Sequence, residues 1–151
     1  MHAASLTRRV TFSAAHRYRR PEWDDAKNEE VFGLCARKQY HGHTYTCDVT
    51  VSGRVDALTG MVVDLRALDR VLRAEVVERF DHRNLNTDIA EFGEGKQIPT
   101  GENLARLIAE NVQRSLGSLA AVSVVTVAED STLSATWRAG PPSAIGRDGG
   151  I

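Results

Sequence analysis

Strict alternation from residue 41 to residue 52 is the feature that most constrains the fold of this chain. One parity of this segment holds two histidines and four apolar or aromatic side chains: His41, His43, Tyr45, Cys47, Val49 and Val51. The other parity is polar from Thr44 onward. Successive side chains of a strand point to opposite faces of a sheet, so the segment predicts a half-buried strand. Both histidines fall on its apolar face.

A second alternating segment begins at Leu6 and also ends in a histidine. Its apolar parity consists of Leu6, Val10, Phe12, Ala14 and His16. Residues 17–40, between the two alternating segments, include Pro21 and Gly33 and show no sustained period. This stretch predicts a long loop with a short helix around Glu29. Loops of that length are usually functional or mobile.

Helical spacing follows the second strand twice. Asp64 precedes apolar residues spaced as in a helix and can cap its first turn, and we expect this helix to end near Phe80. Thr100 can cap a second helix, for which Gly117 is a suitable end. Two strands are then predicted over 121–129 and 132–138.

The predicted order is strand, strand, helix, helix, strand, strand. Short connections at both ends favour an α+β fold with a four-stranded antiparallel sheet and both helices on one face. The other face must be polar or covered by another subunit. We expect a single domain over residues 1–139 and a flexible Gly/Pro-rich C-terminal tail over 140–151.

Composition excludes some classes of partner. The 151 residues carry 19 Lys and Arg against 20 Asp and Glu, a formal net charge of -1. Such a balance provides no strong field to attract nucleic acid or an anionic membrane. No apolar run approaches the ~20 residues that cross a bilayer, and the N-terminus lacks the apolar core of a signal peptide. We therefore expect a cytosolic protein in which Cys35 and Cys47 are free thiols.

Three histidines form a candidate metal site. Side chains two apart on a strand leave the same face, with Cα atoms roughly 6–7 Å apart, so one cation can bridge His41 and His43. If the two strands are neighbours, His16 joins them, and three imidazoles that leave a fourth position open are typical of catalytic zinc. Taken alone, the His41–His43 pair is more often two ordinary, partly buried histidines. Three uncharged imidazoles on one apolar face would each need a hydrogen-bond partner if no metal were bound.

Other titratable residues are candidates for proton transfer and binding. Cys35 lies in the loop before His41, where it could reach a substrate or simply pack as a small apolar residue. Asp81 and His82 follow the first helix as a proton-exchanging pair or as a turn with an incidental histidine. Glu129 shares the parity of apolar neighbours and needs a partner, either an arginine, which the sequence alone favours, or a planar ligand with two adjacent N–H groups.

Six segments together resemble the 6-pyruvoyl-tetrahydropterin synthase family over Phe12 to Glu129. In chain order they are FSAAHRY, VFGLCARKQYHGHTY, TGMVVDL, DHRNLN, PTGENLA and VAE. The resemblance implies the T-fold, in which sheets from several subunits close into a barrel. It also implies a hexamer made of two trimers, with pterin sites at subunit interfaces.

The same resemblance implies roles for single residues. His16, His41 and His43 would bind zinc, and Cys35 with Asp81 and His82 would move protons. Glu129 would anchor the pterin ring, while Thr100 and Glu102 would line its pocket. The implied reaction converts 7,8-dihydroneopterin triphosphate into 6-pyruvoyl-tetrahydropterin with loss of triphosphate, and Mg²⁺ could accompany the triphosphate.

Alternative functions remain open at this stage. A sister branch of the family makes 6-carboxy-tetrahydropterin for the queuosine pathway, but typically has C-x3-HGH, whereas this chain has C-x5-HGH. A third branch, which cleaves the side chain, has Glu in place of the cysteine, so Cys35 argues against it. Outside the family, a zinc hydrolase would not need the thiol. A non-enzymatic zinc clip would need a fourth protein ligand, and none is evident.

Overall fold

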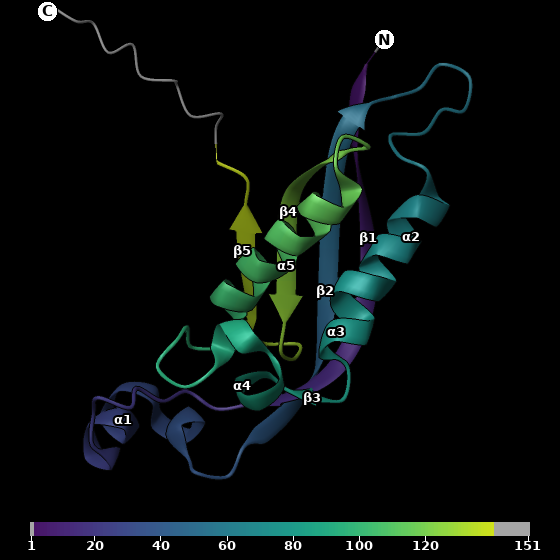
Figure 1. Ribbon diagram of the computed structural model, residues 1–151. Coiled ribbons are helices and arrows are strands. Elements are labelled where there is room, and N and C mark those ends of the chain that lie inside the picture. Colours follow the sequence, from purple (N-terminus) through teal and green to yellow (C-terminus); the bar gives the residue numbers. More distant parts are fainter. Residues whose placement is uncertain (1, 141–151) are drawn as a thin grey trace, which may run out of the picture.

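The structure, a computed structural model, describes residues 2–140. The helices that follow residue 64 lie on one face of a single sheet, whereas the helix over residues 25–32 lies beyond one end of the sheet (Figure 1). The elements in chain order are β1 (Ala3–His16), α1 (Asp25–Phe32), a 3-10 turn (Gly33–Ala36), β2 (His41–Arg54), α2 (Leu65–Leu72), a π-helical stretch (Arg73–Val77), α3 (Glu78–Phe80), β3 (Arg83–Asn84), α4 (Leu85–Asp88), a second 3-10 turn (Ala90–Phe92), α5 (Gly101–Leu116), β4 (Ala121–Ala128) and β5 (Ser134–Arg138).

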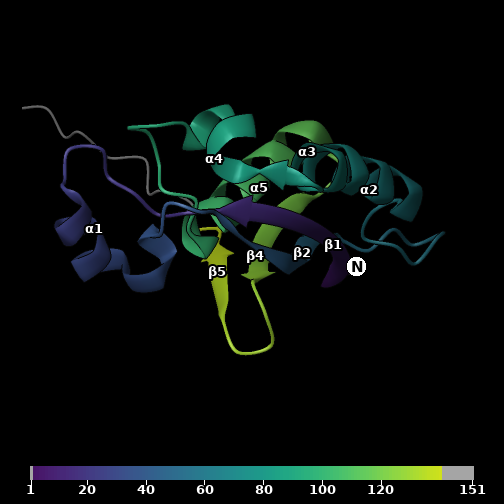
Figure 2. The same ribbon diagram turned by 90° about the horizontal axis from the view of Figure 1, so that it is seen from below.

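The sheet has five strands in the order β3-β1-β2-β4-β5, so the predicted four-stranded antiparallel sheet is wrong in one respect. The four predicted strands are present and pair antiparallel, but β3 adds a short fifth strand parallel to β1. The cause is a tertiary contact: the Asp81 carboxylate accepts a hydrogen bond from the Ser13 N–H, and the His82 N–H donates to the Ser13 carbonyl. These bonds hold the chain against the edge of β1 (Figure 2).

Both predicted long helices are confirmed, together with their ends. Asp64 accepts a hydrogen bond from the Arg66 N–H, and the helical run that it caps ends at Phe80. Thr100 caps α5 by accepting from the Asn103 N–H, and Gly117 ends that helix with φ at 57°. The short helix expected around Glu29 is α1. The π-helical stretch between α2 and α3 was not predicted.

The core lies between the sheet and the helices α2, α3 and α5. Phe12 stacks on Tyr45 with ring centroids 4.9 Å apart and meets Phe80 at 5.6 Å, and all three side chains are buried. Burial of an aromatic or aliphatic side chain of this size contributes roughly 1.5–3 kcal/mol. Since β1 and β2 pair along their full length, with His16 opposite His41 as the last pair, this packing fixes the histidine-bearing ends of both strands.

The opposite face of the sheet is polar, as predicted. Hydroxyl groups pair across neighbouring strands, with Ser5 bonded to Ser52 at 2.9 Å and Thr7 to Thr50 at 2.7 Å. The cysteines are both free, and Cys47 is buried in the core. Within residues 2–140, no helix combines the length and the apolar character needed to span a bilayer. Residues 141–151, which make up most of the predicted tail, lie outside the described residues.

Candidate metal centre and substrate site

The structure brings the three predicted histidines together at the ends of β1 and β2. Their ring centroids lie 4.7 Å apart for His16 and His41, 5.1 Å for His16 and His43, and 5.0 Å for His41 and His43. One nitrogen from each ring lies within 4.8 Å of the others, so the group could hold one metal ion. The pairing of His16 with His41, and the period of two that separates His41 from His43, produce this convergence.

Hydrogen bonds from outside the cluster orient the His16 ring. Its Nδ1 lies 2.9 Å from the Pro99 carbonyl oxygen and 3.1 Å from the Tyr45 hydroxyl. A carbonyl oxygen can only accept, so Nδ1 carries the hydrogen and Nε2 keeps its lone pair free toward the cluster. Burial lowers the pKa of His16 to about 4, so the ring is neutral at pH 7. A neutral imidazole with an outward lone pair is the form that ligates metals.

The nitrogen positions fit zinc. The Nε2 atoms of His16 and His41 are 3.1 Å apart, close to the roughly 3.3 Å that tetrahedral geometry gives for two nitrogens each about 2.0–2.1 Å from zinc. The Nε2 of His43 is buried without a hydrogen-bond partner, a costly arrangement that a cation in the cluster would relieve. Across residues 2–140 the group of candidate ligands contains these three histidines and no fourth residue, which leaves a position for a substrate.

A buried carboxylate adjoins the cluster. Glu129 is 8% exposed, and its Oε2 lies 3.5 Å from the His43 Nε2, while the Tyr18 hydroxyl donates to its Oε1 at 3.2 Å. The prediction of an arginine partner for Glu129 is therefore wrong, because the side chain that bonds to the carboxylate is Tyr18, from the loop after β1. Burial, together with the Glu129 charge, raises the pKa of Tyr18, so the phenol remains a donor.

Cys35 lies on the same side of the molecule as Glu129. The Cys35 carbonyl accepts from the Tyr18 N–H at 2.8 Å, which holds the 3-10 turn against the segment after His16. Burial and, second, the Glu129 charge raise the pKa of the Cys35 thiol. A nearby cation lowers the pKa of a thiol, so a reactive Cys35 thiolate would require a cation in the histidine cluster, because the chain itself favours the thiol.

Asp81 and His82 occupy a different place. The Oδ2 of Asp81 lies 2.9 Å from the His82 Nδ1, while its Oδ1 accepts from Ser13 on the edge strand. The His82 side chain is 84% exposed, and its φ of 57° is uncommon for a residue other than glycine. In the described part of the chain, neither residue contacts Cys35. The structure thus forms the Asp81–His82 pair but does not bring it to the thiol.

Thr100 and Glu102 lie beside the cluster at the start of α5. Pro99, whose carbonyl binds the His16 ring, directly precedes Thr100, and the Thr100 hydroxyl caps the helix. Glu102 is exposed in the first helical turn. Neither side chain has a hydrogen bond to a histidine within residues 2–140, and their role in lining a pterin pocket stays a prediction.

Three supporting residues were missed in the sequence. Tyr45 shares the parity of His43, so it could have been assigned to the site by parity alone. Tyr18 could not, because it lies beyond the end of β1, and neither could Asn86. Its amide accepts from the Arg17 N–H and donates to the Arg17 carbonyl, each at 2.9 Å, and so fixes the residue that follows His16.

Comparisons with known proteins agree with this geometry. Residues 5–140 match the family model described as 6-pyruvoyl tetrahydropterin synthase. The chain is 43% identical over 113 residues to the 6-pyruvoyl tetrahydrobiopterin synthase of Drosophila melanogaster, a match that covers 75% of this chain and 66% of that protein. It is 38% identical over 91 residues to a putative 6-carboxy-5,6,7,8-tetrahydropterin synthase of Archaeoglobus fulgidus, covering 60% and 68%.

A solved structure is similar over nearly the whole chain. The 6-pyruvoyl tetrahydropterin synthase of Caenorhabditis elegans superposes with a TM-score of 0.86 at 32% identity, covering 93% of this chain and 98% of that chain.

Proposed function

Because the chain belongs to the 6-pyruvoyl tetrahydropterin synthase family, we propose that it is a zinc enzyme that converts 7,8-dihydroneopterin triphosphate into 6-pyruvoyl-tetrahydropterin and triphosphate. The observation that carries the proposal is the open three-histidine centre, which adjoins a buried carboxylate on one side. Bound at His16, His41 and His43, zinc would supply Lewis acidity to the hydroxyl groups of the substrate side chain.

Glu129 is suited to hold the pterin ring. A carboxylate accepts two parallel hydrogen bonds from adjacent N–H groups, and the ring and amino N–H groups of a pterin form such a pair. The Tyr18 hydroxyl fixes one oxygen of Glu129 and leaves acceptor capacity on both oxygens. Burial of the carboxylate strengthens these bonds, since little water competes for them.

The reaction balances without an external hydride donor. The first side-chain carbon loses two electrons and the ring C=N bond gains them, with protons moving between the two. The second side-chain carbon, adjacent to the carbon that bears the triphosphate ester, then loses its proton. The C–O bond of the ester breaks with its electron pair on triphosphate, and the remaining enol becomes a methyl ketone. We assign the removal of carbon-bound protons to the Cys35 thiolate. His82, which Asp81 orients, is assigned the return of protons to the substrate.

The separation of Cys35 from His82 supports a site shared between subunits. His82 is largely exposed at an edge of the sheet, whereas Cys35 lies in the turn after α1. A second copy of the chain could bring its own His82 to the thiol, in keeping with the proposed hexamer of two trimers. Light scattering on the purified protein tests this arrangement, since a monomer that retains full activity would contradict it.

Product analysis tests the reaction. Zinc-loaded protein is incubated with 7,8-dihydroneopterin triphosphate, and the products are identified by mass spectrometry. A pyruvoyl product supports the proposal, a carboxy product would assign the chain to the sister branch, and unchanged substrate would contradict the pterin assignment.

Two variants separate the remaining alternatives. Cys35→Ala should abolish turnover while zinc stays bound, whereas a zinc hydrolase would retain most of its activity. Cys47→Ala, in the core, is the matched control and should remain active. A purely structural zinc clip would unfold when a chelator removes the metal, while we expect the far-ultraviolet circular dichroism to persist.

A further inference from the structure

A cavity of about 200 Å³ is lined in part by residues that neighbour His16 and His41 in the chain. Its wall includes Arg17, which directly follows His16, and Tyr40, which directly precedes His41. Pro99, whose carbonyl binds the His16 ring, also lines it. Since a water molecule takes about 30 Å³ of liquid volume, the cavity can hold a phosphate-sized group together with several waters.

Positive charge dominates this wall. Arg17 lies over the Tyr40 ring at 5.4 Å and donates to the Lys38 carbonyl at 3.4 Å, while the Lys96 ammonium donates to the Ala90 carbonyl at 3.0 Å. Within residues 2–140, neither cation forms an ion pair with a carboxylate. Asp25 acts on Arg17 and Glu91 acts on Lys96 only through longer-range electrostatic interaction, so both cations keep most of their charge available for an anion.

Two further charged side chains change the net charge of the cavity wall. Arg19 also lines the cavity and forms an ion pair with Asp25 at 2.7 Å, so its charge is largely compensated. Glu94 is the acidic residue of the wall, and it is exposed in the turn before Gly95. The wall therefore keeps a net positive charge, carried by Arg17 and Lys96.

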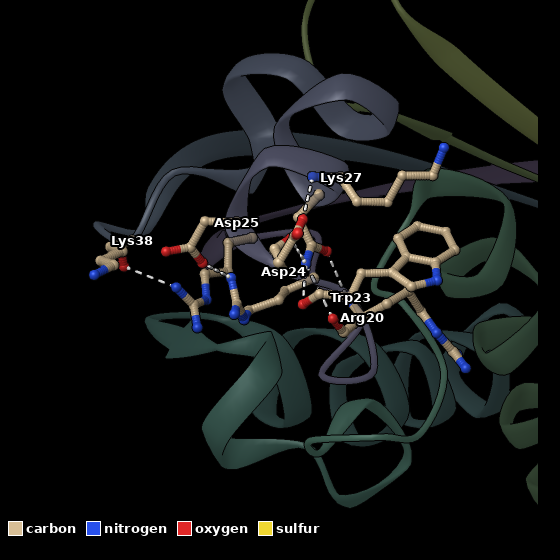
Figure 3. Close-up of polar contacts among 9 residues, drawn as sticks. Arg20, Trp23, Asp24, Asp25, Lys27 and Lys38 are labelled. Atoms are coloured by element: carbon tan, nitrogen blue, oxygen red, sulfur yellow. Dashed lines mark hydrogen bonds and ion pairs between the residues drawn. The ribbon is translucent and has the colours of Figure 1, made fainter.

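The segment that carries the arginines is held in place before any ligand binds. The buried Asn28 side chain accepts from the Arg20 N–H and donates to the carbonyls of Arg20, Trp23 and Asp24. The Asp24 side chain caps α1 through the Lys27 N–H, and these contacts converge on one turn (Figure 3). Asn86 fixes the Arg17 backbone from the other side. Preorganised cations lose less conformational entropy when they bind an anion.

We propose that this cavity binds the oligophosphate tail of the substrate, with Arg17 and Lys96 as its main contacts. The identity of the ligand rests on the proposed function, whereas its anionic character is inferred from the positive charge of the cavity wall. Glu129 lies beside His43, whereas the cavity that holds the cations is lined by the residues next to His16 and His41 in the chain, so a ligand with a neutral planar head and an anionic tail fits in one orientation. Arginine and lysine are the side chains that most often bind phosphate.

Binding of inorganic triphosphate tests the cavity independently of catalysis. Isothermal titration calorimetry is performed on metal-free protein with chelator present, so that zinc cannot contribute. Wild type should bind triphosphate more tightly than inorganic phosphate, and Arg17→Ala and Lys96→Ala should each weaken binding about tenfold or more, because each removes a charge-assisted contact. Arg73→Ala, which removes an exposed arginine paired with Glu78 outside the cavity, is the matched control and should bind as wild type does. Circular dichroism of each variant verifies folding.

The outcomes separate this inference from the proposed function. If wild type fails to bind triphosphate, or if both cavity variants bind it as tightly as Arg73→Ala, the cavity is not the phosphate site, even when the enzyme turns over pterin. If the variants lose triphosphate binding but the wild type produces no pterin product, the anion site is supported and the proposed reaction is contradicted. Should both hold, Lys96→Ala should raise KM for the substrate by a similar factor.

Discussion

Asn86 offers a test of how the site is held. Its side chain makes two hydrogen bonds of 2.9 Å to the backbone of Arg17, the residue after His16. Asn86→Ala removes both bonds. A hydrogen bond of this type contributes a net 0.5–1.5 kcal/mol, so the free energy of unfolding should fall by about 2 kcal/mol. For a chain of this length that loss corresponds to a decrease in Tm of about 4–8 °C.

Zinc affinity should fall as well. Partners that orient metal ligands typically change affinity by 10–100-fold when removed, and Asn86 acts one residue away from the ligand, so we expect about tenfold. Urea unfolding measures the first effect, and competition with a chromophoric chelator measures the second.

Gln113→Ala is the matched control for both measurements. The Gln113 side chain also bonds to the backbone, at the Gly117 and Ala120 carbonyls and the Val122 N–H, but at the far end of α5. Its loss should destabilise the chain by a similar amount and leave zinc affinity unchanged. If Asn86→Ala and Gln113→Ala bind zinc equally well, the reasoning that Asn86 positions His16 is refuted.

Further predictions concern the thiols, the core and the acid range. Cys47 is fully buried and its pKa is raised to about 12, so native protein should react with a thiol reagent at Cys35 alone, and two rapidly reacting thiols before denaturation would contradict this. Phe80→Ala should cost about 3–5 kcal/mol in urea unfolding, and a loss below 1 kcal/mol would show that the core collapses around the change. The Ser13 N–H holds the pKa of Asp81 below its ordinary 3.8, so the carboxylate stabilises the fold fully above about pH 5 and progressively less as pH falls through and below 3.8. Asp81→Asn should flatten that part of the stability curve, and an unchanged curve would disprove the linkage.

The histidine cluster could be predicted from sequence because a period of two fixes the direction of every side chain on a strand. Once β1 and β2 were expected to pair, only the register was open, and the register that sets the two histidine-bearing ends opposite each other brings His16 to His41. The helix ends could be predicted equally well, since Asp64, Thr100 and Gly117 determine them through contacts within the same helix.

Features that depend on tertiary contacts could not be predicted in this way. Strand β3 has two residues, too few for any periodic signal, and forms because Asp81 and His82 bond to Ser13. The partner of Glu129 was wrong for a related reason, since no pattern places the loop that carries Tyr18. Both errors concern segments whose conformation is set by what they touch.

The pairing of His16 with His41 has a consequence for how this chain can diverge. These residues form the last pair of the β1–β2 ladder, so the whole segment 17–40 begins and ends at two of the proposed metal ligands. Lengthening such a loop costs little in closure entropy, about 0.6 kcal/mol for each doubling. Insertions or deletions there would leave the ligand geometry intact while they relocate Cys35 and the cavity wall. Descendants of this sequence can thus acquire a different substrate site without changing the strand ends that carry the three histidines.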